Sequence, residues 1–207
     1  MTTPRTLLSS ESDDSTLDVL EVLHTRVLRL DGPDRDRFLL SKGHNPLAYY
    51  AVLAATGRLD PALLPSYGDW DSPLGHHPDR TLLDPVEISS GSLGHGLPIA
   101  VGLALGLRAQ SLHGRVFCLL GDGELDEGSN AEAVQYAGRV RLAALTAVVI
   151  DNASAAHGWP GGIAERFRRE GWAALTVDGR NHDALDDALH RQADAPSAVV
   201  ATVEPRR

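Results

Sequence analysis

Two short polar motifs, each at the end of an apolar stretch, constrain the fold of this chain more than any other feature. Gly121-Asp122-Gly123 ends the stretch VFCLLGDG, and Asp151-Asn152 ends the stretch AALTAVVIDN. The segment between them, ELDEGSNAEAVQYAGRVRL, is rich in small residues and predicts a helix that connects two strands. Strand, helix and strand in this order form a parallel pair, so both motifs are expected at the carboxyl ends of their strands.

The residue types in these motifs are suited to one kind of ligand. The Asp122 carboxylate and the Asn152 side-chain oxygen are hard oxygen donors of the kind that bind Mg²⁺ or Ca²⁺. The neighbouring glycines allow the backbone to approach a phosphate group closely. Together the motifs predict a diphosphate held through a divalent cation, whereas either motif alone would be typical of an ordinary turn after a strand.

The rest of the chain predicts an α/β fold, a parallel sheet flanked by helices. STLDVLEVLHTRVLRL has apolar residues at helical spacing, and NPLAYYAVLAATG has a proline near its start and a glycine at its end, as helices do. GSLGHGLPIAVGLALGLRAQ is apolar on almost every side, which predicts a buried helix. Strands are then expected at 116–120, 145–150, 173–177 and 197–203, with helices at about 127–138, 161–170 and 182–193.

Length and patterning favour one domain. Residues 1–14 are expected to be a flexible leader, and residues 15–207 a single domain, because 207 residues with 43% hydrophobic side chains can bury one substantial core. The segment 58–90 is rich in Pro, Gly, Asp and His without a clear period. An irregular segment of that length predicts an active-site loop.

Composition excludes some classes of protein. The net charge of -9 argues against nonspecific nucleic-acid binding, which requires a basic surface. No apolar run is long enough to span a bilayer, so no membrane partner is expected. The single cysteine, Cys118, lies in an apolar run and can form no disulfide within the chain. With no export signal in the sequence, these features favour a cytoplasmic protein.

Three motifs also occur together and in order. They are DRDRFLLSKGH (34–44), GSLGHG (91–96) and GDGELDEGSNAEA (121–133), the last followed by Asp151-Asn152. In order and spacing they resemble the N-terminal diphosphate-binding domain of transketolases, and the resemblance runs from about residue 15 to residue 203. It implies the thiamine diphosphate-binding fold, with thiamine diphosphate held through Mg²⁺ or Ca²⁺.

The resemblance assigns roles to residues around the diphosphate. Asp122 and Asn152 would bind the metal through their side chains and Ser154 through its backbone carbonyl, while the Gly123 N–H would bind a phosphate oxygen. In GSLGHG, the Gly91 carbonyl would bind the cofactor's exocyclic amino group, and the Leu93 side chain would support its bent shape.

Catalytic residues are implied by the same resemblance. His44 matches a histidine that contacts the diphosphate, and His77 matches one that reaches the substrate, although the adjacent His76 competes for that role. Glu127 and Glu132 resemble glutamates that lie between two active sites, where their proton affinities would be coupled; otherwise they would form a solvated helix face. His95 stands where the family usually has glutamine, and His157 is expected either in the crevice or in an ordinary loop.

The implied function is one half of a two-chain enzyme. The sequence ends at PSAVVATVEPRR without a pyrimidine-binding domain, so a partner chain carrying that domain is expected, in a heterotetramer. The reaction would transfer a two-carbon ketol unit from a ketose phosphate to an aldose phosphate.

Two departures from the family concern the substrate. A histidine-bearing GHxG segment is replaced by SSESDDST, and a later glycine-rich loop is absent. The acceptor could therefore instead be a thiol on an acyl carrier protein. The alternatives are a decarboxylating 2-oxo acid dehydrogenase subunit and a noncatalytic regulatory homologue.

Overall fold

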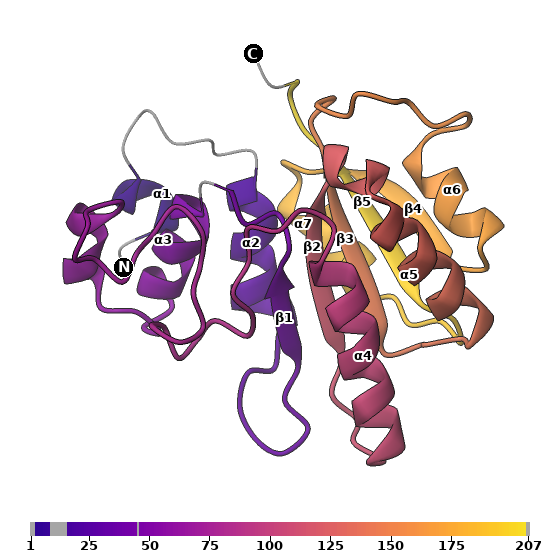
Figure 1. Ribbon diagram of the computed structural model, residues 1–207, viewed down its shortest axis with the longest axis horizontal. Coiled ribbons are helices and arrows are strands. Elements are labelled where there is room, and N and C mark those ends of the chain that lie inside the picture. The colour runs from indigo at the N-terminus through magenta and orange to yellow at the C-terminus, as the bar shows by residue number, and fades with distance from the viewer. Residues whose placement is uncertain (1–2, 9–15, 45, 206–207) are drawn as a thin grey trace.

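A five-stranded parallel sheet forms the centre of the molecule, with the strand order β1-β2-β3-β5-β4 (Figure 1). The computed structural model describes residues 3–8, 16–44 and 46–205. The strands are β1 (Arg37–Leu40), β2 (Val116–Gly121), β3 (Leu145–Asp151), β4 (Ala173–Asp178) and β5 (Ser197–Thr202). Every strand pairing is parallel, so all five carboxyl ends lie at the same edge.

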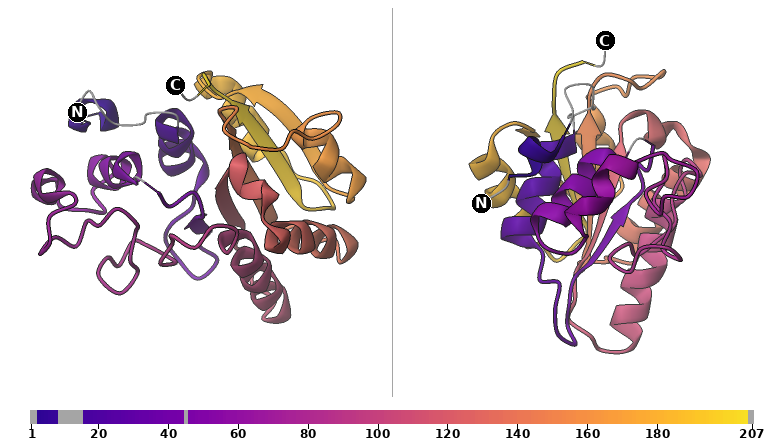
Figure 2. Two further views of the ribbon diagram at one scale, coloured as in Figure 1. Left: turned by 45° about the horizontal axis from the view of Figure 1, so that its top comes forward. Right: turned by 90° about the vertical axis from the view of Figure 1, so that its left-hand side faces the viewer.

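Helices cover both faces of this sheet, as parallel sheets require (Figure 2). One face is covered by α2 (Leu17–Val22), the π-helical turn η2 (Leu23–Val27) and α7 (His182–His190). The helix α3 (Leu47–Ala55) packs against α2 and extends the same core beyond the edge strand β1. The other face is covered by α4 (Gly96–Ala109), α5 (Gly128–Arg139) and α6 (Ile163–Arg169). The remaining elements are α1 (Pro4–Leu7) and the 3-10 turns η3 (Pro61–Ser66) and η4 (Gly123–Asp126).

The residues of β2 show how two cores share one strand. Phe117 and Leu119 belong to the core under α2 and α7, whereas Cys118 and Leu120 belong to the core under α4 and α5. This alternation follows from the two-residue period of a strand. Because both faces are buried, the strand is apolar throughout, and the GDG motif is held at its end.

The predicted α/β fold with a parallel sheet is confirmed, and the four predicted strands all form. The strand β1, which consists of RFLL and pairs with β2, was not predicted. The first helix is shorter than expected, because its last turn is η2 and it ends at Val27.

The helix predicted from GSLGHGLPIAVGLALGLRAQ begins only at Gly96, and within this single chain one side of it is exposed. Leu97, Ala100 and Ala104 are buried, but Ile99 on another side is 41% exposed. Among the described residues, no helix is both long and apolar enough to cross a membrane.

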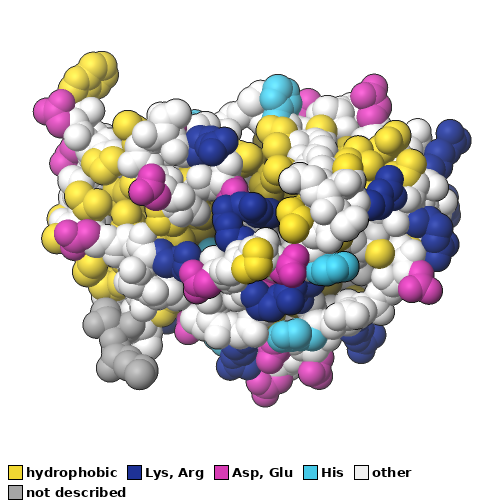
Figure 3. Space-filling view, turned by 90° about the horizontal axis from the view of Figure 1, so that it is seen from below, with side chains coloured by type: hydrophobic (Ala, Val, Ile, Leu, Met, Phe, Trp, Pro, Cys, Tyr) yellow, Lys and Arg dark blue, Asp and Glu magenta, His cyan; other side chains and the backbone are white. Residues whose placement is uncertain are grey.

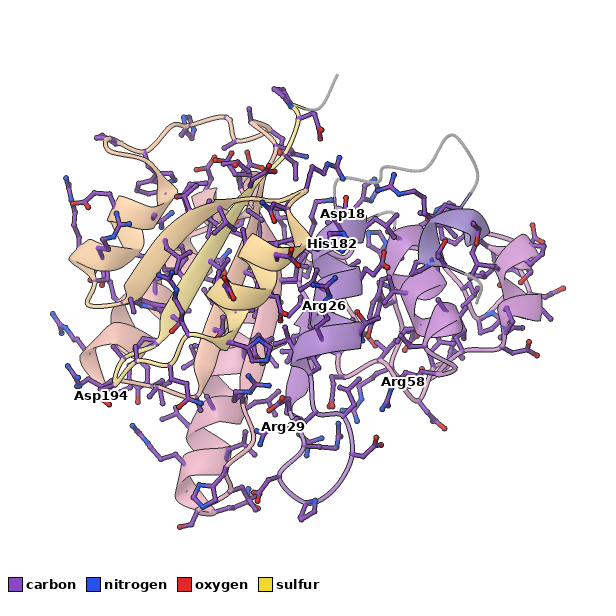
Figure 4. The ribbon with its side chains drawn as sticks, turned by 180° about the vertical axis from the view of Figure 1, so that it is seen from behind. Asp18, Arg26, Arg29, Arg58, His182 and Asp194 are labelled. Carbon is purple, nitrogen blue, oxygen red and sulfur yellow. The ribbon has the colours of Figure 1, made fainter. Side chains whose placement is uncertain are left out.

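The N-terminal helices are tied to the C-terminal half through Asp18, as Figure 4 shows. Its carboxylate accepts a hydrogen bond of 2.7 Å from Arg180 and lies 2.8 Å from His182 Nε2. Burial alone would raise the pKa of Asp18, but the hydrogen bonds from His182 and Arg180 outweigh it and hold that pKa below its ordinary value.

Arg5 of α1 also reaches Asp18, and Pro4 of the same helix is buried. The predicted flexible leader falls partly on these residues. Residues 1–2 and 9–14 of it lie outside the part of the chain that the structure describes.

Candidate functional site

A cavity of about 310 Å³ opens at the carboxyl ends of the strands, between four segments of the chain. These segments follow β1, precede α4, follow β2 and follow β3, and a fifth, the irregular segment 58–90, contributes His77. The lining residues are Ser41, Lys42, Gly43, His44, His77, Gly91, Leu93, Gly121, Gly123, Glu124, Asp126, Ser154 and Ala156. All three motifs of the sequence analysis therefore meet in one cavity.

Asp122 lies directly behind this wall and organises the loop that follows β3. It is 2% exposed, and its carboxylate accepts hydrogen bonds from the Ser154 N–H (2.7 Å), the Ser154 hydroxyl (2.6 Å) and the Ala155 N–H (3.0 Å). The loop can turn back in this way because Ala153 adopts a left-handed conformation with φ of 55°. The two predicted metal-binding motifs are thus in direct contact.

Asn152, in the same loop, is one of several buried polar side chains that the described part of the chain leaves without a hydrogen-bond partner; Ser90 and Asn130 are others. Its side chain is 3% exposed, and its Oδ1 atom is buried without a hydrogen-bond partner among the described residues. A buried acceptor in this state is unfavourable by about 1–3 kcal/mol unless a ligand or water satisfies it. A cation bound beside Asp122 would satisfy it, so the residues present fit the metal that the sequence predicts.

The rest of the coordination would have to come from uncharged oxygens. In the described chain, no three His, Cys, Asp or Glu side chains come together as a metal-binding group. The Ser154 carbonyl lies beside Gly123, 3.6 Å from the position that a Cβ on that glycine would take. Asp122, Asn152 and this carbonyl are the oxygens that could hold a cation, with phosphate oxygens completing its shell.

Gly123 itself is not required by the fold of this chain. A Cβ there would make only ordinary contacts of 3.6–3.8 Å, and its φ is not positive. By contrast, a Cβ on Gly96 would come within 2.2 Å of Ser41. Packing therefore explains the glycine at position 96, whereas at position 123 a ligand that approaches the backbone is the better explanation.

Glu124 is the site residue that the sequence analysis missed. It is 3% exposed, and its carboxylate accepts a hydrogen bond from the Ser41 hydroxyl and from the N–H groups of Gly94 (3.0 Å) and Gly121 (3.4 Å). Burial raises the pKa of Glu124, and these hydrogen bonds oppose the rise. This one side chain joins the loop after β1, the GSLGHG loop and the GDG turn.

The predicted glutamates Glu127 and Glu132 both lie at α5 with exposed side chains. Neither lines the cavity, whereas Asp126 does. The side chain of Glu127 packs over Gly94, where an added Cβ would come within 2.6 Å of it. A position between two active sites requires a second chain, so their coupled role stays a prediction.

His44 and His77 lie next to each other in the lining of the cavity. Their Nδ1 and Nε2 atoms are 3.5 Å apart, and the ring centroids are 5.4 Å apart. Burial lowers the pKa of His77, and the proximity of His44 and His76 lowers it further. The neutral imidazole of His77 is therefore favoured.

The choice between His76 and His77 has a geometric answer. His76 turns away, with its Nδ1 3.2 Å from the Tyr67 hydroxyl, and only His77 lines the cavity. His95 and His157 are exposed and do not line it.

Gly91 and Leu93, from the loop before α4, also line the cavity. Gly91 has a φ of +129°, and a Cβ there would come within 3.0 Å of the His77 ring, so glycine is required for both backbone and packing. Leu93 lines the cavity and is 55% exposed. An exposed leucine at the mouth of a cavity is suited to an apolar part of a ligand or to a partner chain.

Comparison with known proteins points to one family. The family model described as "Transketolase, thiamine diphosphate binding domain" matches residues 15–203. A protein named ferredoxin fas2, from Rhodococcoides fascians, is 56% identical over 201 residues, which cover 94% of this chain and 66% of that protein.

Two further comparisons agree with the family model. The 6-deoxy-6-sulfo-D-fructose transketolase subunit SqwG, from Clostridium sp. (strain MSTE9), is 34% identical over 188 residues, or 86% of this chain and 68% of that protein. The crystal structure of transketolase from Campylobacter jejuni subsp. jejuni matches with a TM-score of 0.80 at 27% identity, over 89% of this chain and 32% of that one. The chain thus spans about two thirds of the first two relatives and about one third of the third.

Proposed function

This chain belongs to the transketolase family as a thiamine diphosphate-binding domain, and we propose that it is the diphosphate-binding subunit of a two-chain transketolase. The proposed reaction moves a two-carbon ketol unit from a ketose phosphate to an aldose phosphate. Thiamine diphosphate, when bound, supplies the nucleophilic carbon for this chemistry.

One observation carries the proposal: the buried, unpartnered Oδ1 of Asn152, in the loop that also binds the Asp122 carboxylate. A domain that served only as an interaction module would gain nothing from an unsatisfied oxygen beside a buried carboxylate. Asp122, Asn152 and the Ser154 carbonyl would hold Mg²⁺ or Ca²⁺, and the Gly123 N–H would bind a phosphate oxygen.

The remaining cavity residues would bind and orient the substrate and cofactor. His44 would contact the diphosphate, and His77, with its lowered pKa, would accept a hydrogen bond or a proton from a substrate hydroxyl. Gly91 and Leu93 would line the part of the cofactor that carries the amino group. Glu127 is proposed to act only in the assembled enzyme.

A partner chain is part of the proposal. Relatives from Actinobacillus succinogenes and Clostridium sp. are named as transketolase subunits, which supports a division of the enzyme between two polypeptides. We expect the partner to carry the pyrimidine-binding domain, and Leu93 and Ile99 are exposed apolar residues near the cavity that it could cover.

The test uses the chain together with its partner. Thiamine diphosphate binding in the presence of Mg²⁺ is measured by calorimetry for the natural pair, for Asn152→Ala, and for Asn181→Ala as a control. Asn181 caps α7, so its loss should change stability but leave cofactor affinity intact. Loss of binding in Asn152→Ala alone supports the site, and unchanged binding in that variant contradicts it.

The acceptor is tested on the same pair. Ketol transfer from a ketose phosphate is followed with an aldose phosphate, with a carrier-protein thiol, and with pyruvate as a donor for decarboxylation. Rapid transfer to the aldose phosphate supports the proposal. Transfer only to the carrier, or turnover only of pyruvate, would replace it by one of the alternatives from the sequence.

A further inference from the structure

A second cavity lies at the opposite end of the sheet, where the strands begin and where α4, α5 and α7 end. Its volume is about 470 Å³, larger than that of the candidate cofactor site. Four arginines and two histidines line it: Arg108, His113, Arg115, Arg141, His190 and Arg191. None of the described lining residues is acidic, although the whole chain has 28 acidic and 19 basic residues. We call it the amino-end cavity.

The charges of three of these arginines are not balanced by an ion pair. Arg108 donates a hydrogen bond of 2.9 Å only to the Val140 carbonyl, and within the described chain Arg108, Arg141 and Arg191 form no ion pair. Arg115 differs, because it is paired with the buried Asp36.

The space-filling view from below looks onto this end of the molecule, where basic side chains (dark blue), histidines (cyan) and acidic side chains (magenta) lie close together among hydrophobic ones (Figure 3). Carboxylates lie close by as well: Asp36 is paired with Arg115, and Asp34 accepts a hydrogen bond of 2.8 Å from the His113 N–H. Asp186 is paired with His190, and Asp194 lies at the same end of the molecule but does not line the cavity (Figure 4). The positive charge inside the cavity is therefore not neutralised by its own lining.

Basic residues at helix C-termini are common, because they balance the negative end of the helix dipole. Each C-terminus carries about half a negative charge, so three helices supply about −1.5. The three arginines without ion pairs supply twice that amount with opposite sign. Helix capping therefore accounts for only about half of this charge.

Two residues at this end of the molecule also have an unfavourable backbone conformation. Among the described residues, only three other than glycine have a positive φ: Ser111 (57°), Arg141 (48°) and, in the candidate cofactor site, Ala153 (55°). Ser111 and Arg141 directly follow the last turns of α4 and α5, and the bonds Leu112 N–H to Leu107 O (3.0 Å) and Leu142 N–H to Ala137 O (3.1 Å) close both helix ends. Glycine is the preferred residue at such positions.

Arg141 thus occupies a position at which glycine would be the more stable residue. What arginine adds is a guanidinium group at the wall of the amino-end cavity. Strain that persists at a binding surface is a recognised sign of a functional residue.

We propose that the amino-end cavity binds a small phosphorylated metabolite, a phosphate monoester of the size of a sugar or nucleoside phosphate. The guanidinium groups of Arg108, Arg141 and Arg191 bind the phosphate, because arginine pairs with phosphate oxygens through two parallel hydrogen bonds. Leu112 and Leu142 supply an apolar wall for the organic part. The volume lies in the range of small-molecule sites, about 300–1,000 Å³. This site is separate from the proposed cofactor site and does not depend on it.

The test uses NMR, because signals from individual arginines show at which end of the molecule a ligand binds. The side-chain Nε–Hε signals of the arginines are followed while the full chain is titrated with fructose 6-phosphate, with fructose, and with NaCl at equal ionic strength. We expect saturable shifts at Arg108, Arg141 and Arg191 with the phosphate ester alone. Equal shifts with NaCl, or none with the ester, would overturn the proposal.

Two glycine substitutions separate binding from folding. Arg141→Gly relieves the strain and removes a guanidinium, so it should weaken fructose 6-phosphate binding by about tenfold while the melting temperature rises. Ser111→Gly relieves the same strain and should raise the melting temperature without a loss of affinity. Equal affinities in the two variants would contradict a phosphate site at this cavity.

Discussion

The two ends of one sheet carry charge in opposite ways. At the carboxyl ends, Asp122 and Glu124 are buried and each accepts three hydrogen bonds, whereas the Asn152 oxygen is buried without a partner among the described residues. At the amino ends, Arg108, Arg141 and Arg191 form no ion pair within the described chain, and Arg141 has a positive φ. Removal of one member of a buried hydrogen-bond network leaves its partners unsatisfied and destabilises the fold. Replacement of an exposed charged side chain usually has little effect on stability.

The largest effect is expected at the carboxyl end, from Asp122→Asn. This change keeps the size and one acceptor oxygen, which can still accept from the Ser154 and Ala155 N–H groups, but removes the charge that would attract a cation, so cofactor-dependent activity of the paired enzyme should fall by roughly 100-fold or more. Asp178→Asn, at the end of β4, is the matched control and should retain activity. Equal losses in both variants would argue against a metal at Asp122.

The second prediction concerns the hydrogen bonds of Glu124 and their contribution to stability, and the variant is Glu124→Ala. Removal of the carboxylate leaves the buried Gly94 and Gly121 N–H groups without their acceptor, so the free energy of unfolding should fall by about 2–4 kcal/mol. Urea denaturation measures this loss. Glu124→Gln keeps one acceptor and should lose less than half as much; if both variants lose equally, the hydrogen bonds are not the source of the stability.

A buried carboxylate also exists at the amino end, but it is stabilised by charge. Asp36 is paired with Arg115 (2.6 Å) and Arg29 (3.0 Å). Burial alone would raise its pKa, yet the hydrogen bonds from these arginines outweigh burial and lower the pKa of Asp36 to about 2.

A depressed pKa means that the stabilisation from Asp36 is complete above the ordinary value of 3.8 and is lost as the pH falls toward about 2. The loss should be about 2 kcal/mol. Measured by urea denaturation, the stability gap between the natural chain and Asp36→Asn should narrow by that amount between about pH 6 and pH 2.5. A gap that does not change with pH would show that the ion pairs contribute no net stability.

How much of this could be predicted from the sequence differs between the two ends. The strands β2 and β3 are continuous apolar runs, so the positions of Asp122 and Asn152 at neighbouring strand ends followed from local pattern alone. The four residues of β1 lie between charged and polar motifs, and they form a strand by pairing with β2, which lies far along the chain.

The same limit applies to side chains. Glu124 is buried because Ser41 and Gly94 meet it from loops that are distant in sequence, and nothing in GELDE distinguishes it from Asp126 or Glu127. The arginines of the amino-end cavity are spread along the chain, and no spacing relates them. Local periodicity predicts which elements form, but contacts between loops become visible only when the fold is known.

The smallest expected effects are changes in the free energy of unfolding at the two strained helix ends. They test whether residues at the amino end can be replaced without damage to the fold. Ser111→Gly and Arg141→Gly should each raise the free energy of unfolding by about 1 kcal/mol, since glycine adopts a positive φ without steric conflict. The gains should add in the double variant, because the residues follow different helices and share no hydrogen bond. Gln110→Gly, whose φ of -91° suits any residue, should instead lower stability slightly. If glycine at Ser111 and Arg141 also lowers stability, the left-handed conformation at these helix ends is not strained. The conformation of Arg141 would then give no sign of a functional role.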